Sequence, residues 1–167
     1  MILKWESGFL DPLIEKINSY PGDAWVKLHR WFSITAKYAG ENRELCLLRT
    51  ILTVEMSGTD NEFERELSRI NSKYALFFRR LVEQGKSQGV FDADLDTHTL
   101  AYSIMALMDG TLLQWYHSYK YVEGPDMVKI GRRMMFHGIR PRLKAEGAHD
   151  WRPAGAVSSP STSELMG

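Results

Sequence analysis

Residues 97–119 read THTLAYSIMALMDGTLLQWYHSY, and this stretch decides the fold. It is the most apolar part of the chain, but Asp109-Gly110 interrupts it after a run of uncharged residues from Thr97 to Met108. A membrane-spanning helix needs about 20 apolar residues, so this run is too short to cross a bilayer. We therefore expect a buried core helix over about residues 95–119, apolar nearly all round.

Outward from this helix, apolar residues recur every three or four positions in five further segments, which is the spacing of a helix face. No alternation of apolar and polar residues between turn pairs indicates a strand. The predicted helices cover about residues 11–20, 22–39, 42–57, 60–88, 95–119 and 124–139. The sequence therefore predicts an all-α fold, a six-helix antiparallel bundle.

Residues at the ends of these segments fit helix caps. Asp11 followed by Pro12 is typical of a helix N-terminus, and Asn42 is the expected cap of the third helix. Thr59 and Glu62 have the spacing of a capping box, which predicts the start of the fourth helix. Three glycines are expected to end helices: Gly40, Gly58 and Gly89.

The third predicted helix is apolar on two faces. One face consists of Leu45, Leu48 and Leu52, and the other of Leu47, Ile51 and Val54. A helix that is apolar on two sides is typical of the middle of a bundle. We therefore expect this helix to be central.

Composition excludes several classes of protein. The 167 residues include 21 Lys plus Arg and 21 Asp plus Glu, so the formal net charge is zero. Zero charge argues against a uniformly basic nucleic-acid binder. The single cysteine, Cys46, excludes an internal disulfide and any metal site built from several thiolates. Residues 1–8 lack the basic and apolar regions of a signal peptide, and no spanning helix is expected, so we predict a cytoplasmic protein without membrane contact.

The end of the chain differs in composition. From Leu143 onward Gly, Ala, Ser and Pro dominate, with few apolar anchors. Such composition is typical of a segment that cannot bury enough apolar surface to fold. We therefore predict a helical domain over residues 1–142 and a disordered tail over residues 143–167.

The last two predicted helices favour a dimer. Each is apolar on more than one side, so the sixth cannot cover the fifth completely, and two copies would form a four-helix bundle. Three glycines would let helix backbones approach closely. The alternative is a monomer in which these glycines merely fit the core. The residues expected at the homodimer interface are Leu107, Gly110, Thr111, Gln114, Trp115, Met127, Ile130, Gly131, Met134 and Gly138.

Residues 81–91 (LVEQGKSQGVF), then Asp96, Ala101 and Leu107-Met108-Asp109-Gly110, resemble the C-terminal domain of TetR-family transcriptional regulators. The resemblance covers about residues 11–141 and implies that the six helices match the last six of the family's nine. It implies ligand sensing and dimerisation in a repressor-type regulator. The ten residues before Asp11 are too few for the family's helix-turn-helix. We therefore expect DNA contact only through a helix-turn-helix domain missing from this chain.

The resemblance also implies a small-molecule pocket among the helices. Pockets of this kind are mostly apolar, which points to an apolar or aromatic effector. The alternative for each candidate is a core position, since aromatic and Met side chains at helical spacing usually pack. The apolar, aromatic and histidine candidates are Trp25, His29, Phe32, Leu52, Met56, Tyr74, Phe77, Phe78, Tyr102, Met105 and Met108.

Two carboxylates stand in apolar helices and need a partner or water. Glu55 is expected to pair, with Arg49 for example, or to be exposed near its helix end. The other possibility is that Glu55 faces a cationic ligand. For that reason Glu55 is the last member of the candidate ligand-binding set. Asp109 is expected to belong to a structural network near the dimer seam.

Enzyme motifs are absent from the sequence. There is no glycine-rich phosphate loop and no Gly-x-Ser-x-Gly, and the five histidines lack metal-ligand spacing. We therefore expect no catalytic residue, no cofactor and no metal. Two readings remain open: a ligand-sensing and dimerisation domain, or a helical interaction module that dimerises without a specific ligand.

Overall fold

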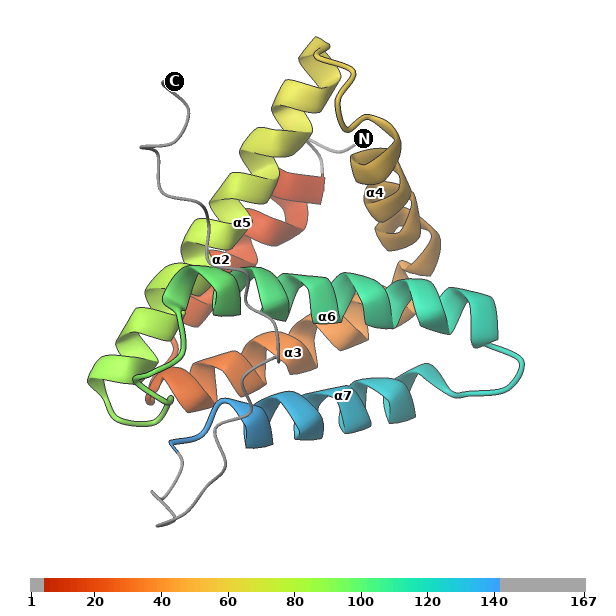
Figure 1. Ribbon diagram of the computed structural model, residues 1–167. Helices are drawn as coiled ribbons and strands as arrows, with labels where there is room; N and C mark the ends of the chain where they lie inside the picture. The colour runs from red at the N-terminus through yellow and green to blue at the C-terminus, as the bar shows by residue number, and fades with distance from the viewer. Residues whose placement is uncertain (1–4, 142–167) are drawn as a thin grey trace, which may run out of the picture.

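The computed structural model describes residues 5–141, and every regular element in that range is helical (Figure 1). The elements are the π-helix η1 (Glu6–Leu10) and the α-helices α2 (Asp11–Asn18), α3 (Ala24–Glu41), α4 (Arg43–Glu55), α5 (Glu62–Ser87), α6 (Thr97–Ser118) and α7 (Gly124–Gly138). The prediction of an all-helical fold with six α-helices is confirmed over this range. The predicted tail lies outside the described residues.

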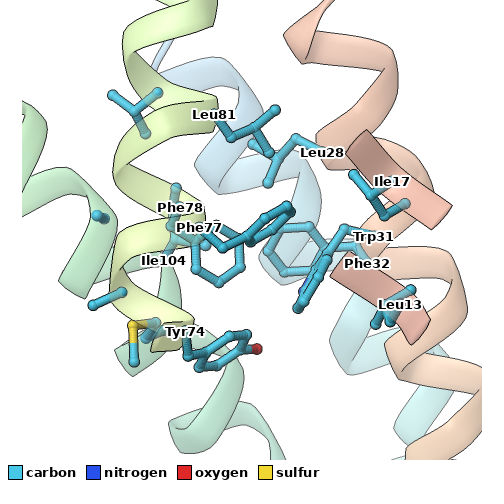
Figure 2. Packing of buried hydrophobic residues seen from close by; sticks show 14 of the residues in the cluster. Leu13, Ile17, Leu28, Trp31, Phe32, Tyr74, Phe77, Phe78, Leu81 and Ile104 are labelled. Atoms are coloured by element: carbon cyan, nitrogen blue, oxygen red, sulfur yellow. The ribbon is translucent and has the colours of Figure 1, made fainter. Parts of the chain in front are cut away.

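Helix α5 carries the face around which the core is built. Its buried side chains recur every three or four residues, and they include Leu67, Ile70, Tyr74, Phe77, Phe78 and Leu81. Trp31 of α3 stacks on Phe77 at 4.4 Å between ring centroids and meets Phe78 edge-on at 5.2 Å. Figure 2 shows this aromatic cluster between α5, α3 and α2. Aromatic pairs of this kind contribute about 0.5–1.5 kcal/mol beyond their burial.

The chain is helical before Asp11, so the prediction that Asp11 caps a helix start is wrong. The backbone is already helical at Trp5, the first described residue, and Asp11 has helical angles and donates its N–H to the carbonyl of Glu6, five residues earlier. Pro12 explains this wider turn, because a proline ring clashes with the carbonyl four residues before it in a regular α-helix. The π-turn relieves that clash and allows η1 to continue into α2.

The first of the three glycine stops is wrong, because α3 continues through Gly40 to Glu41. Asn42 makes the turn into α4 with φ −129° and ψ 40°. Its side chain does not cap α4, because its Nδ2 donates to the carbonyl of Tyr38 at 3.1 Å. A glycine ends a helix only where the backbone takes a left-handed turn, and this connection needs none.

The N-cap of α5 is Asn61, two residues later than the predicted Thr59. Asn61 Oδ1 accepts a hydrogen bond from the N–H of Glu64 at 2.8 Å, and the Glu64 carboxylate accepts from the N–H of Gly58 at 2.6 Å. Asn61 and Glu64 thus have the spacing of a capping box, but the Glu64 carboxylate accepts from the N–H groups of Gly58 and Asp60, which precede the cap residue. Three polar residues precede the helix, and the capping-box spacing alone selected the wrong one.

The other end of α5 follows the prediction. Gly89 has φ +69°, and the N–H of Val90 donates to the carbonyl of Gly85 at 3.0 Å. Gly85 itself allows a close approach, since a Cβ there would lie 2.1 Å from the ring of Phe91. Phe91 is almost fully buried. The end of α5 therefore folds back onto the helix through one glycine and one aromatic ring.

Helix α4 lies at the edge of the bundle, so the prediction that it is central is wrong (Figure 1). It buries Cys46, Leu47 and Thr50, while one side of it, with Leu48, Ile51 and Val54, is exposed. Apolar residues on two faces predicted burial on both. In the chain as described, only one face has a partner.

Helix α6 packs on α5 through Ala101, Ile104 and Met105, and α7 runs antiparallel beside it (Figure 1). The opposite side of α6 is exposed at Ala106 and Gly110. No helix within residues 5–141 combines the length and the apolar character that crossing a membrane requires. The helix that decides the fold is therefore half buried within this chain.

Candidate ligand cavity

A cavity of about 470 Å³ lies between the second half of α3, the start of α4, the second half of α6 and the start of α7. Trp5 and Phe9 of the N-terminal helix close one side of it. Small residues of α3 leave the space open: Ala36, Ala39 and Gly40. The surface of the cavity is mostly apolar, with aromatic walls at Phe32, Tyr38, Tyr74 and Trp115. Size and character both match pockets that hold small organic molecules.

One ion pair lies in the cavity wall. Arg49 Nη2 of α4 donates to Asp109 Oδ1 of α6 and, at 3.3 Å, to the hydroxyl of Thr50. The Arg49 guanidinium also lies over the ring of Trp5, 5.3 Å from the centroid. Both charged side chains are largely buried, so each stabilises the other against the cost of desolvation. Asp109 therefore has a charged partner, and the pair lies in the cavity wall. Glu55 is exposed near the end of α4, which is one of the two arrangements expected for it.

Two polar groups near this ion pair, Tyr74 and Cys46, are neutral. Tyr74 donates its hydroxyl to the sulfur of Met108 at 3.4 Å, and burial raises the pKa of Tyr74 above its usual value. Cys46 is a buried free thiol, and burial raises its pKa above the usual value. Within residues 5–141, no group of three or more His, Cys, Asp or Glu side chains could hold a metal ion. The cavity can thus offer apolar contact, a few hydrogen bonds and the positive charges of Lys37, Lys129 and Arg132, which also line it.

Trp115 closes the end of the cavity where α4 meets α6. A Cβ on Gly124 would lie 2.5 Å from the Trp115 ring, so this glycine gives the indole its place. The guanidinium of Arg43 lies 5.4 Å from the ring centroid of Trp115, 5.3 Å from that of Tyr116 and 4.9 Å from that of Tyr119. These cation–π contacts fix the start of α4 against the end of α6.

An ionic cluster holds the N-terminal helix on α5. The buried carboxylate of Glu6 accepts from Arg69 Nη1 at 3.1 Å and Nη2 at 2.5 Å, and from Lys73. Lys73 also donates to Asp11 at 2.9 Å. The hydrogen bonds from Arg69 are the main reason that the pKa of Glu6 lies below its usual value. The helix that carries Trp5 into the cavity wall is therefore fixed by charge.

The predicted ligand-binding residues divide among four places. The cavity brings together Phe32, Tyr74 and Met108, whereas Trp25 and His29 line a second cavity between α3 and α7. Five of them pack in or against the core: Leu52, Met56, Phe77, Phe78 and Met105. Glu55 and Tyr102 are exposed and line neither cavity.

Several cavity residues were not in the predicted set. Arg49 and Asp109 are 60 positions apart, and neither was expected to line a pocket. Trp5 and Phe9 were missed because the N-terminal helix was predicted to begin after them. One signal was available: the small residues Ala36, Ala39 and Gly40 follow one another at the end of an otherwise bulky helix. Small side chains in such a position leave space that larger ones would fill.

The residues predicted for the dimer interface lie on the facing and outer sides of α6 and α7. Ile130 is 54% exposed and Met134 70% exposed, unusually high for apolar side chains in mid-helix. A Cβ on Gly110 or Gly138 would meet no atom within 4 Å in this chain. Four others, Leu107, Thr111, Trp115 and Gly131, line the cavity. Gln114 is exposed and Met127 half-buried.

Comparison with known proteins places these features in context. The family model described as "Tetracyclin repressor-like, C-terminal domain" matches residues 29–116, more than half of the chain. Among solved structures, the crystal structure of the MbdR regulator from Azoarcus sp. CIB is similar, with 26% sequence identity and a TM-score of 0.73. That match covers 81% of this chain and 72% of the MbdR chain. No functionally curated protein matches the sequence.

Proposed function

Because the chain belongs to the family of tetracycline-repressor-like C-terminal domains, the ligand-binding and dimerisation part of a transcriptional regulator, we propose that the 470 Å³ cavity is its effector site. The effector is a small molecule with an apolar or aromatic body. The single observation that carries this proposal is an apolar cavity with one ion pair, Arg49–Asp109, in its wall. A filled core would instead have favoured an interaction module without a ligand.

The position of Trp5 and Phe9 supports a route from the cavity to the rest of a regulator. Both belong to the N-terminal helix, and both line the cavity. A ligand that prefers one position of this helix shifts the population toward that position, by its difference in affinity for the two arrangements. In a regulator of this family, such a shift would change the geometry of the DNA-binding parts. We also propose that the protein acts in the cytoplasm, where the DNA bound by such a regulator lies.

A homodimer through α6 and α7 completes the proposal. Ile130 and Met134 are exposed, and a Cβ on Gly110 or Gly138 would meet no atom within 4 Å. In this proposal the four residues belong to one outward face. Packing within one chain does not explain glycine at Gly110, which costs a helix interior about 1 kcal/mol relative to alanine. A second copy of the same face offers apolar area and close backbone contact, as two-fold dimers require.

The effector site can be tested with a neutral apolar probe, N-phenyl-1-naphthylamine, whose fluorescence rises in apolar surroundings. We expect saturable binding to the native chain, and loss of that binding in Ala36→Trp, because the indole would occupy the cavity. Leu76→Trp, at an exposed position of α5, is the matched control and should bind as the native chain does. Equal binding by the two variants would place the probe elsewhere and remove the cavity from the proposal.

A further inference from the structure

A second cavity, of about 320 Å³, follows the first along the groove between α3 and α7. Its lining contains four permanent cations and no carboxylate among the described residues: Lys129, Arg132, Arg133 and Arg140. Two histidines, His29 and His137, and the rings of Trp25 and Phe136 complete it. A whole chain with zero net charge therefore concentrates four positive charges around one hollow.

These cations lack acidic partners within residues 5–141, where none of the four forms an ion pair. Arg132 Nη2 lies 2.8 Å from Nδ1 of His29, which can only accept when the imidazole is neutral. The guanidinium of Arg140 lies 4.5 Å from the ring centroid of Trp25. Asp92, whose N–H donates to the carbonyl of Ile139, uses its carboxylate on the N–H of Asp94 and does not line the cavity.

The pKa of the His29 imidazole responds to the positive charges of this cavity. Burial lowers the pKa of His29, and the charges of Arg132 and Arg140 lower it further. Neighbouring positive charges disfavour protonation of the imidazole. An anion bound in this cavity would favour protonation and so raise the pKa of His29. His29 is also held in place, because its ring stacks on Phe136 at 3.7 Å with an interplanar angle of 12°. Trp25 meets Phe136 edge-on at 4.6 Å and fixes the other side of this floor.

The two cavities share two residues, Lys129 and Arg132. Since α3 and α7 run antiparallel, the N-terminal half of α7 lines the first cavity and its C-terminal half lines the second (Figure 1). The change along this groove is from apolar walls to a basic hollow. One ligand with an apolar end and an anionic end fits that change.

We propose that the second cavity binds the phosphate group, or groups, of an effector whose apolar part occupies the first cavity. Guanidinium groups suit this task, because their paired N–H donors match the oxygens of a phosphate. The inference rests on the proposed function for the apolar end and adds a chemical class: a phosphate ester or diphosphate with an apolar or aromatic body.

The matched probes are 1-naphthol and 1-naphthyl phosphate, which differ by the phosphate, titrated by calorimetry at constant ionic strength. We expect the phosphate ester to bind about tenfold more tightly or better, as charge-assisted hydrogen bonds would give. If neither probe binds, the effector site itself fails. If both bind with equal affinity, the effector site stands and the phosphate site is overturned.

The double variant Arg133→Gln with Arg140→Gln removes two exposed cations of the second cavity. It should bring the affinity for 1-naphthyl phosphate close to that for 1-naphthol and leave 1-naphthol unchanged. The control is Arg79→Gln with Arg80→Gln, which removes the same charge from the exposed side of α5. Equal losses in the two double variants would mean general charge attraction and would overturn the site.

A second readout observes the cavity directly. In a histidine NMR titration, inorganic pyrophosphate should raise the pKa of His29, with a smaller effect on His98, which lies outside both cavities. An unchanged His29 would contradict the proposal. A competition experiment gives a second outcome that would contradict the proposal. In it, a DNA duplex displaces 1-naphthyl phosphate at concentrations where pyrophosphate does not, and the displacement depends on Arg133 and Arg140. The hollow would then be part of a nucleic-acid surface.

Discussion

Phe9 stacks on Tyr38 with 3.6 Å between ring centroids and an interplanar angle of 16°. This contact joins the N-terminal helix to α3 at the wall of the cavity, because both rings line it. The relation makes the position of the helix and the shape of the cavity dependent on each other.

Replacing Phe9 by alanine should therefore change both stability and binding. We expect Phe9→Ala to lower the free energy of unfolding by about 1–3 kcal/mol, less than for a fully buried Phe, because Phe9 is only partly buried and lines the cavity. Affinity for N-phenyl-1-naphthylamine should fall as well. Urea unfolding and probe titration measure the two effects. The control Phe63→Ala, at an exposed position of α5, should change neither the stability nor the probe affinity. If Phe9→Ala also left both unchanged, the position of the N-terminal helix and the shape of the cavity would not depend on each other.

Asp109→Asn should release Arg49 from its ion pair. The side chains of Arg49 and Asp109 are 14% and 32% exposed, so a loss of about 1–3 kcal/mol is expected, between surface and buried pairs. The guanidinium of Arg49 would then be free to pair with an anionic ligand, so the Asp109→Asn variant should bind 2-naphthoate more tightly than the native chain does. Asp60→Asn, in the exposed pair with Arg65, is the control and should change stability by less than about 0.5 kcal/mol.

The Glu6 cluster should make stability depend on pH. Because the pKa of Glu6 is lower in the folded chain than its usual 4.5, its contribution is fully present above about pH 5. The contribution is lost as the pH falls through the folded pKa. The difference in unfolding free energy between the native chain and Glu6→Gln should therefore shrink from pH 6 to pH 3. Glu83→Gln, on the exposed side of α5, should give a smaller and flatter difference; a constant difference for Glu6→Gln would exclude this linkage.

The dimer proposal can be tested by placing a charge at one of two equally exposed apolar positions, one on the proposed interface and one on another helix. Met134 on α7 and Val54 on α4 are each 70% exposed. We expect Met134→Glu to weaken dimerisation about tenfold or more, because it would bury a charge in an apolar interface, and Val54→Glu to leave it unchanged. Size-exclusion chromatography with light scattering, over a range of concentrations, measures this. A native chain that is monomeric at micromolar concentration would refute the dimer.

Gly85→Ala should destabilise the fold, since the new Cβ would lie 2.1 Å from the buried Phe91 ring. Overpacking of this kind costs about 1–3 kcal/mol. The double variant with Phe91→Leu should recover part of the loss, because the smaller side chain leaves room, and thermal unfolding measures both. Gly89→Ala would also destabilise, through its φ of +69°, but Phe91→Leu should not rescue it.

The helices were predictable because each has a strong local pattern, whereas their exact ends depend on competition between neighbours. Thr59, Asp60 and Asn61 can all cap a helix, and the choice of Asn61 depends on where Glu64 can return. The apolar pattern of α4 was visible, but its position at the edge depends on which face meets the rest of the chain. Periodicity reports that a face is apolar and not what covers it.

The cavity was harder to predict than the core because it depends on contacts between distant segments. Tyr74 and Phe77 are aromatic residues of the same helix and both pack against Trp31, yet only Tyr74 lines the cavity. Arg49 and Asp109 meet only after α4 and α6 are placed. Charge along the sequence is balanced, so the basic hollow between α3 and α7 becomes visible only when Arg132 and Arg140 are brought to His29 and Trp25.

The π-turn at Glu6–Leu10 has a consequence for the comparison of this domain with its relatives. One additional residue in a turn rotates the side chains before it by about 100° relative to those of an uninterrupted α-helix. Trp5 and Glu6 therefore occupy positions that a straight helix would give to residues one step later in sequence. An alignment with a relative whose helix lacks this π-turn needs a gap of one residue here. Without that gap, it would assign the cavity-facing aromatic residue and the buried carboxylate to the wrong columns.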